Sequence, residues 1–326
     1  MKHWIPRIAL GLLGLVALAL VCGSVYEALA RRQLASRFPL RGKLVDIGER
    51  RLHIDCRGSG SPTVVFETGF DPTGALGWSL VHDPIAETTR ACAYSRAGIL
   101  ASDPGMGKRD ARAIADDLHA LLARAGEPPP LVLVAHSLGG IYALTYTQKF
   151  GADVAGLVLV DTSHAEMKQR MAAAGLHLKD PLRTLRIASI LSWTGLLRLV
   201  VGSADAEAAY LPTTLAAMLV EGKAIDQSLA QAGALRQLGN RPLFVLTAGK
   251  LSAAFLDQAQ LTPEQGSQFQ AVWRDLQNEQ ASWSTHSRHE IVAEAAHHIQ
   301  EDTPERVVAA TRWVVDAVRA DNGSPP

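Results

Sequence analysis

One stretch of the sequence could carry nucleophilic chemistry. Residues 131–140 read LVLVAHSLGG, so Ser137 follows an apolar run and lies just before two glycines. A serine at such a place either caps a helix or acts as a nucleophile. Nucleophilic attack needs an imidazole that takes the hydroxyl proton, and two adjacent histidines, His297 and His298, occur late in the chain. The elements around these residues decide whether they can meet.

Short apolar runs alternate with helical patterns around Ser137. Strands are expected at residues 43–47, 51–56, 64–67, 91–94, 131–135, 157–160, 243–246 and 290–293. Residues 111–125 are amphipathic, and the sequence Gly-Glu-Pro that follows them ends this helix. Strands that alternate with helices predict a mostly parallel sheet covered on both faces. Ser137 then lies between a buried strand and a helix at residues 138–150.

Small residues flank Ser137 in the spacing of a nucleophile elbow, a sharp turn that exposes a serine between a strand and a helix. The serine backbone is strained there, so the residues two before and two after it must be small. Gly139 meets this need on one side. On the other side Ala135 stands where glycine is commoner, and it adds only one methyl group. The pattern A-x-S-x-G between a predicted strand and helix favours the nucleophile.

The chain resembles the α/β-hydrolase family over roughly residues 43–320. Five landmarks occur in the order of that family: TGF at 68–70, YSRAG at 94–98, AHSLGG at 135–140, LVLVDTSH at 157–164, and AEAAHHIQEDTPERVV at 293–308. The resemblance looks closest to bacterial hydrolases with an N-terminal membrane segment. It implies an α/β-hydrolase fold, with a mostly parallel eight-stranded sheet, helices on both faces and a helical cap inserted after the sixth strand.

The resemblance also implies which histidine is the base. In the family the catalytic histidine follows the last strand, usually after a glycine and before an apolar residue and a helix. His297 takes that place if Ala296 stands for the glycine. His298 is the competing candidate, and a structural role for both histidines is the remaining alternative.

The acid that orients the histidine is less directly indicated. The family usually places it just after the strand at 243–246, but the first carboxylate there is Asp257, which comes late. Some branches place the acid after the preceding strand, where this chain has Asp161. A carboxylate at either place would hold the imidazole and favour its charged form. Asp161 is the preferred candidate, and Asp257 remains open.

The oxyanion hole implied by the resemblance consists of two backbone N–H groups. Leu138 supplies one, and the loop after the strand at 64–67 supplies the other, for which Phe70 is the choice. Glu67 enters the same loop. This carboxylate is either a second functional acid or, more commonly, the partner of a nearby arginine such as Arg96.

The N-terminal region differs from the rest of the chain. Residues 8–26 are uncharged and apolar, which is long enough for a helix to cross a bilayer. We expect a single membrane span with the catalytic domain outside the cytoplasm. The alternative is a secretory signal cleaved near Ala30, since Ala28-Leu29-Ala30 has the form of a cleavage site.

The chain divides into three predicted parts. Residues 1–36 form the membrane or signal segment, residues 37–164 and 240–326 the catalytic core, and residues 165–239 a helical cap. The cap is leucine-rich and would line the substrate pocket. A cap that faces a membrane is disfavoured because Arg183, Arg186 and Arg198 interrupt its most apolar part.

The charge balance excludes some classes of partner. The chain has 32 basic and 32 acidic residues, so no net field attracts nucleic acid. We find no nucleotide-binding glycine loop and no paired cysteines at metal-ligand spacing, so neither a cofactor nor a metal is expected. In the implied fold, the strands that carry Cys56 and Cys92 are neighbours, which predicts a disulfide and an oxidising compartment. Two buried free thiols are the alternative.

The resemblance therefore implies a serine hydrolase. It would cleave a small-molecule carboxylic ester through an acyl-enzyme formed by Ser137, with His297 and Asp161 completing the triad. Epoxide opening and halide displacement use a carboxylate at the elbow in this fold, which the serine argues against. Amide hydrolysis, acyl transfer and carbon–carbon bond hydrolysis use the same triad. A membrane-tethered binding module with little turnover is the alternative from another class.

Overall fold

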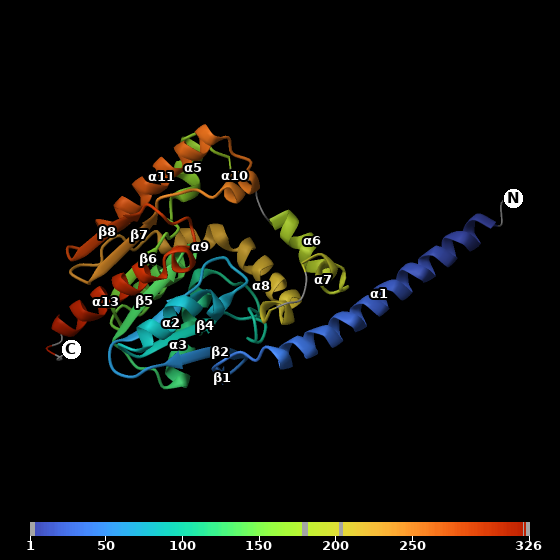
Figure 1. Cartoon of the computed structure of the whole chain (residues 1–326), viewed down its shortest axis with the longest axis horizontal. Coiled ribbons are helices and arrows are strands. Elements are labelled where there is room, and N and C mark those ends of the chain that lie inside the picture. Colours follow the sequence, from blue (N-terminus) through green and yellow to red (C-terminus); the bar gives the residue numbers. More distant parts are fainter. Residues whose placement is uncertain (1–3, 178–181, 202–204, 322, 324–326) are drawn as a thin grey trace.

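The centre of the molecule is a sheet of eight strands in the order β1-β2-β4-β3-β5-β6-β7-β8 (Figure 1). The computed structural model describes residues 4–177, 182–201, 205–321 and 323. β2 is antiparallel to β1 and β4, and the remaining neighbours are parallel. The strands are β1 Lys43–Asp46, β2 Arg51–Arg57, β3 Thr63–Glu67, β4 Ala91–Ser95, β5 Leu131–His136, β6 Val154–Val160, β7 Leu243–Ala248 and β8 Ser287–Val292. The predicted fold class is confirmed.

Both faces of the sheet are buried, as the apolar runs predict. Alternate residues of β5 point to opposite faces, so Leu131 and Leu133 join one core cluster while Val132 and Val134 join the other. Helices α3 (Ala111–Ala125) and α4 (Gly139–Lys149) cover the first face. Helices α2 (Ser79–Ala86) and α13 (Pro304–Asp321) cover the second.

The segment between β6 and β7 is helical where the structure describes it. Its helices are α5 Met167–Ala173, α6 Leu182–Ser192, α7 Leu196–Val201, η2 Glu207–Ala209, α8 Leu211–Lys223 and α9 Ile225–Ala232. α9 packs on α3 and α4, whereas α6 packs on α8. In Figure 1, α6 and α7 stand away from the sheet on the side where α1 leaves the domain.

The segment between β7 and β8 holds two further helices. α10 spans Ala253–Ala259, and α11 spans Pro263–Ala281. α11 begins with a capping box, in which the Thr262 and Gln265 side chains each bond to the other's backbone N–H. Short elements complete the fold: η1 Gly74–Trp78 and α12 Ile299–Asp302.

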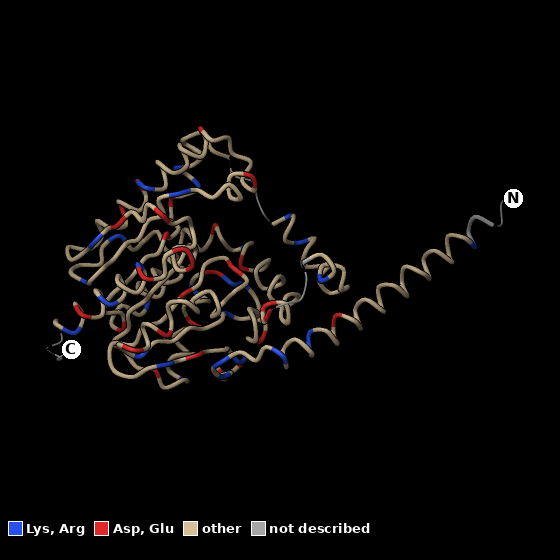
Figure 2. The backbone as a smooth tube through the Cα atoms, in the orientation of Figure 1, with Lys and Arg blue, Asp and Glu red and all other residues tan. Residues whose placement is uncertain are grey.

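Helix α1 (Trp4–Arg37) projects from the domain as a long single helix (Figure 1). Within it, Arg7–Arg37 is long and apolar enough to be a membrane span, and its most apolar window is unburied. A signal sequence has the same properties. Figure 2 shows charged residues gathered where α1 meets the domain and almost none along the projecting part.

A disulfide joins β2 to β4. Cys56 and Cys92 are direct partners in the antiparallel register of these strands and form the Cys56–Cys92 bond. The predicted pairing is confirmed, and the alternative of two buried thiols is wrong. Cys22, on α1, is an exposed free cysteine.

Candidate active site

Ser137 lies in the turn between β5 and α4, with backbone strain at its centre. Its φ angle is 52°, in the left-handed region that non-glycine residues seldom adopt. The turn is held by its own backbone, because the Ser137 N–H donates to Val160 O at 3.2 Å and Ser137 O accepts from Ser163 N at 2.9 Å. Neighbouring strand β6 therefore holds the serine in a conformation that a free chain would leave.

Two glycines after Ser137 are required by close contacts. A Cβ at Gly139 would lie 2.5 Å from Glu67 O, and a Cβ at Gly140 would lie 2.5 Å from Thr162 Cβ. Ala135, by contrast, is fully buried within the sheet without needing to be glycine. The elbow predicted from A-x-S-x-G thus has its strand, turn and helix, and it depends on a second glycine that the pattern does not include.

The structure brings Ser137, His297 and Asp161 into one chain of contacts. His297 Nε2 lies 2.9 Å from Ser137 Oγ, and His297 Nδ1 lies 2.6 Å from Asp161 Oδ2. His298 instead lies 3.6 Å from Glu301, at the surface. Asp257 is exposed on α10. The geometry of a nucleophile, a base and an orienting acid is therefore present at the carboxyl ends of the strands.

Asp161 is held by donors on both of its oxygens. Its side chain is buried, and Oδ1 accepts from Ala248 N at 2.9 Å and from Trp273 Nε1 at 2.9 Å. The other oxygen faces His297. These contacts leave the carboxylate one orientation, so it can fix the ring of His297. The contribution of Trp273, on α11, was not expected from the sequence.

A second histidine supports the loop that carries His297. His136 is buried at the end of β5, and its Nε2 lies 2.9 Å from His297 O. Burial lowers the pKa of His136 well below its ordinary value, and the nearby rings of His297 and His298 lower it further. A neutral His136 therefore places no positive charge beside the imidazole that must accept a proton.

The two candidate oxyanion donors flank Ser137. A Cβ at Gly69 would lie 2.7 Å from Ser137 Cβ, so the loop that contains Phe70 passes directly against the serine. Leu138 is the residue after the serine. Neither the Phe70 N–H nor the Leu138 N–H donates to another residue in the described part of the chain. Both N–H groups are thus available to a substrate oxygen.

A buried ion-pair network holds the loop that contains Phe70. The Arg96 guanidinium lies 2.8 Å from Glu67 and also donates to Thr68 O at 2.6 Å and Gly69 O at 2.8 Å. The expected pairing of Glu67 with Arg96 is confirmed. Arg96 also pairs with Glu221 on α8 at 3.0 Å, a contact that the sequence did not indicate. One guanidinium therefore ties the loop that contains Phe70 to the helical segment after β6.

The network places two carboxylates beside one guanidinium, out of water. Glu67 also accepts a hydrogen bond from the Tyr94 hydroxyl. Burial raises the pKa of Glu67 to about 7, although Arg96 and Tyr94 favour its ionised form. Glu221, the second carboxylate, adds to the rise.

We expect this network to lose stability as the pH rises through about 7. The pKa of Glu67 is about 7 in the folded state against an ordinary 4.5, so between these values the folded chain holds a proton that the unfolded chain has released. The contribution of Glu67 to the free energy of unfolding is therefore complete below pH 4.5, falls as the pH rises from there, and is lost above about 7. Urea unfolding of the detergent-solubilised chain from pH 5 to 8.5, compared with Glu67→Gln, measures it. The unsubstituted chain should show the steeper fall, and parallel curves would contradict the assignment.

A cavity of about 200 Å³ opens beside Ser137 and His297. Two methionines of α5 line one wall, Met167 and Met171, and the other walls come from the segment after β7. That segment contributes Lys250, Leu251, Ser252, Phe255, Phe269, Gln270 and Trp273. The sequence pointed to residues 165–239 as the pocket lining, and the contribution of α10 and α11 was missed. The largely apolar walls would accommodate an apolar group bound to a reacting carbonyl.

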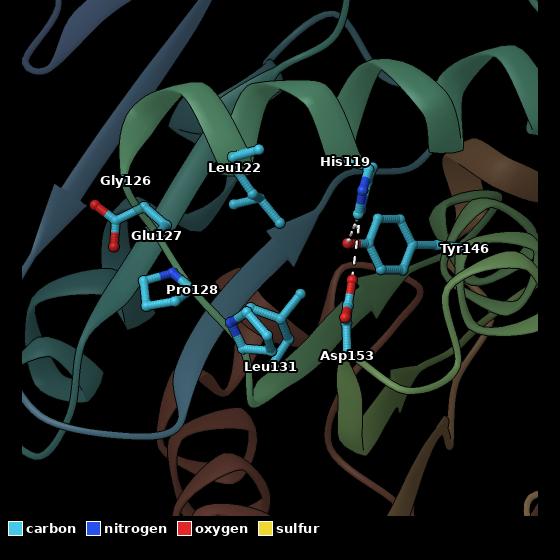
Figure 3. A pocket seen from close by; sticks show the side chains of 10 residues that line it. His119, Leu122, Gly126, Glu127, Pro128, Leu131, Tyr146 and Asp153 are labelled. Carbon is cyan, nitrogen blue, oxygen red and sulfur yellow. Dashed lines mark hydrogen bonds and ion pairs between the residues drawn. The ribbon is translucent and has the colours of Figure 1, made fainter.

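A second hollow, of about 390 Å³, lies at the opposite end of β5. Figure 3 shows His119, Tyr146 and Asp153 meeting at one side of it, with His119 Nδ1 3.4 Å from Asp153. Its described lining includes no serine or cysteine. In parallel α/β sheets ligands bind at the carboxyl ends of the strands, which is where Ser137 lies. The smaller cavity beside the triad is therefore the candidate site.

Comparison with known proteins agrees with this architecture. A model of the alpha/beta hydrolase family matches residues 18–310. A protein of Hormonema carpetanum named as a probable transporter is 35% identical over 136 residues, which cover 39% of this chain and 19% of that protein. The chain thus spans about a fifth of that relative's length.

Two solved structures show the same fold. A thermophilic esterase from Thermogutta terrifontis superposes with a TM-score of 0.59 at 20% identity, covering 86% of this chain and 99% of the esterase. A probable hydrolytic enzyme from Pseudomonas aeruginosa gives a TM-score of 0.61 at 19% identity, covering 85% and 95%. At these identities the likeness concerns the fold.

Proposed function

We propose that this chain, which belongs to the alpha/beta hydrolase family, is a serine hydrolase that cleaves a carboxylic ester through an acyl-enzyme. The observation that carries the proposal is the unbroken line of contacts from Ser137 through His297 to Asp161. The apolar cavity beside it and the resemblance in fold to an esterase support the same reading.

The proposed reaction has two halves. Ser137 Oγ attacks the ester carbonyl carbon while His297 Nε2 takes its proton, and the N–H groups of Phe70 and Leu138 bind the oxyanion. His297 then gives the proton to the leaving alcohol, which leaves an acyl group on Ser137. Water attacks the acyl carbonyl carbon while His297 takes a proton from it, and His297 returns that proton to Ser137 Oγ as the bond to the acyl group breaks and the carboxylic acid departs. Throughout, Asp161 orients the imidazole and stabilises its charged form.

We further propose that α1 is retained and anchors the enzyme. Glu27 of α1 and Arg198 of α7 form a buried ion pair at 2.7 Å, and cleavage near Ala30 would separate them. Removing one partner of a buried ion pair strongly destabilises the folded protein, because the other charge is left buried and unpaired. The Cys56–Cys92 disulfide favours a catalytic domain outside the cytoplasm, where such bonds persist.

The test uses the full chain in detergent. Nitrophenyl esters of increasing acyl length measure turnover, and a serine-directed fluorophosphonate measures whether one serine becomes labelled. We expect hydrolysis, labelling at Ser137, and an optimum among the shorter acyl chains because the cavity is about 200 Å³. A folded chain that hydrolyses none of the esters and takes up no label would favour a membrane-tethered binding module. Turnover of matched amides faster than esters would move the proposal to an amidase.

A further inference from the structure

Helices α6 and α7 form a hairpin with an unusually apolar surface. Its exposed large apolar side chains range from 38% exposed at Leu191 to 84% at Val200. The full set is Ile187, Ile190, Leu191, Trp193, Leu196, Leu199 and Val200. Single exposed apolar residues are common, but a cluster of this kind on two adjoining helices marks a surface that contacts something apolar.

The hairpin approaches α1 closely at one point, where Gly23 of α1 meets the turn between α6 and α7. A Cβ at Gly23 would lie 2.2 Å from Thr194 O, and a Cβ at Gly195 would lie 2.9 Å from Gly23 O. The buried Glu27–Arg198 pair then locks the two helices together. α1 and the hairpin therefore form one unit.

The place of this contact along α1 sets the depth of the hairpin. The uncharged stretch at residues 8–26 is about 28 Å long as a helix, close to the thickness of a bilayer core. An apolar hollow between α1 and the hairpin is lined by residues of α1 from Val16 to Tyr26 and by Leu196 and Leu199. Val16 lies about 15 Å along the helix from Tyr26. If residues 8–26 span the bilayer, α7 therefore reaches about halfway across its apolar core.

The charges of the hairpin fit this position. Arg198, which by sequence should interrupt the apolar surface, is neutralised by Glu27 and buried. Arg183 and Arg186 are exposed but lie in the first half of α6, away from α7. Trp193 at the turn lies under the Arg31 guanidinium at 5.3 Å, a pairing suited to the boundary between lipid and water.

We propose that the α6–α7 hairpin is embedded in the same bilayer leaflet as the adjoining half of the apolar stretch of α1, so that lipid acyl chains cover its apolar surface. The occupant is lipid because this surface is continuous with a helix long and apolar enough to span a membrane. The predicted cap would thus have two parts, α5, which lines the pocket, and the α6–α7 hairpin, which lies in the membrane.

The embedded hairpin also indicates where substrate comes from, a step that rests on the proposed function. A Cβ at Gly222 of α8 would lie 2.4 Å from Leu182 of α6 and 3.2 Å from Phe70. Gly222 therefore lies between the start of the hairpin and the loop that contains Phe70, in close contact with both. An ester dissolved in the leaflet is the substrate class that this arrangement favours.

Tryptophan fluorescence tests the surface without reference to catalysis. The full chain is placed in phosphatidylcholine–phosphatidylglycerol vesicles with bromine at defined acyl carbons, and the signal lost in Trp193→Phe isolates Trp193. We expect bromolipid to quench this signal and aqueous acrylamide to spare it. Quenching by acrylamide, as for tryptophan in water, would overturn the proposal. Protection from both quenchers would also overturn it and would indicate a second copy of the chain on this surface.

A charge on the hairpin tests the consequence for substrate supply. In Leu199→Asp, we compare the rate on an ester dissolved in vesicles with the rate on a water-soluble ester. The ratio of the first rate to the second should fall by about tenfold or more, since a carboxylate on this exposed surface resists entry into lipid. Leu80→Asp, an exposed leucine on α2, is the matched control and should leave the ratio unchanged. An unchanged ratio in Leu199→Asp would refute supply from the leaflet. Failure of both esters in the unsubstituted chain would refute the proposed function, and the Trp193 result would still stand.

Discussion

Replacing Ser137 with alanine is expected to lower kcat for ester hydrolysis by on the order of 10⁶-fold, to the level left by binding and the oxyanion hole alone. In the proposed reaction the Ser137 hydroxyl, which lies 2.9 Å from His297 Nε2, attacks the ester, and alanine has no group that could replace it. Steady-state rates on the best nitrophenyl ester measure the loss. Fluorophosphonate labelling should disappear with it.

A serine of the same cavity provides the control. Ser163 lines the pocket and donates its backbone N–H to Ser137 O, and its hydroxyl takes no part in the proposed proton transfer. Ser163→Ala should therefore keep most of the activity and all of the labelling. If Ser137→Ala retained turnover similar to that of Ser163→Ala, the nucleophile would lie elsewhere.

Asp161→Asn is expected to lower kcat by about 10⁴-fold while the chain stays folded. The Ala248 and Trp273 N–H groups both donate to Oδ1, so the asparagine oxygen must take that place and its NH₂ group must face His297 Nδ1. The imidazole is then forced to carry its proton on Nε2, which can no longer accept the proton of Ser137.

The exposed Asp257 is the matched control for this substitution. Asp257→Asn makes the same chemical change at an exposed position on α10. It should leave kcat within about twofold of the unsubstituted value, because surface substitutions usually have small effects. Rates on the same ester, with circular dichroism to confirm folding, compare the two. A large loss in Asp257→Asn together with an active Asp161→Asn would reverse the assignment of the acid.

Local patterns were sufficient to predict most of the sheet and the elbow. Every predicted strand has its counterpart. For the central strands β3 to β7 the reason is that a strand buried on both faces must be a short apolar run. Ser137 could be predicted because the strand, the small residues and the helix around it are local in the sequence. The contacts that require Gly139 and Gly140 come from Glu67 and Thr162 in other segments, so the need for Gly140 was visible only in the folded chain. His297 and Asp161 came from the family's order of landmarks, and only the folded chain shows them in contact.

Contacts between distant segments could not be read from the sequence. Trp273 donates to Asp161 from 112 residues away, and the Glu27–Arg198 pair spans 171 residues. One signal was available: Phe269, Trp273 and Leu276 recur at helical spacing in a polar stretch, which indicates an amphipathic helix facing the core. The pocket wall on α11 could therefore have been found, whereas the ion pair between α1 and α7 could not.

Because Asp161 follows β6, two tasks that neighbouring loops often share, catalysis and the lining of the pocket, fall largely to different loops. The acid and the nucleophile follow adjacent strands, β6 and β5, so the segment after β7 holds no member of the proposed triad. That segment instead supplies Phe255 and Phe269 to the pocket wall. Leu251, Phe255 and Phe269 are apolar and form no side-chain hydrogen bond to the reacting groups, whereas Trp273, Gln277 and Gln280 of α11 bond to residues 161–163. Libraries that vary Leu251, Phe255 and Phe269 together offer a route to new acyl preferences from one unchanged catalytic centre.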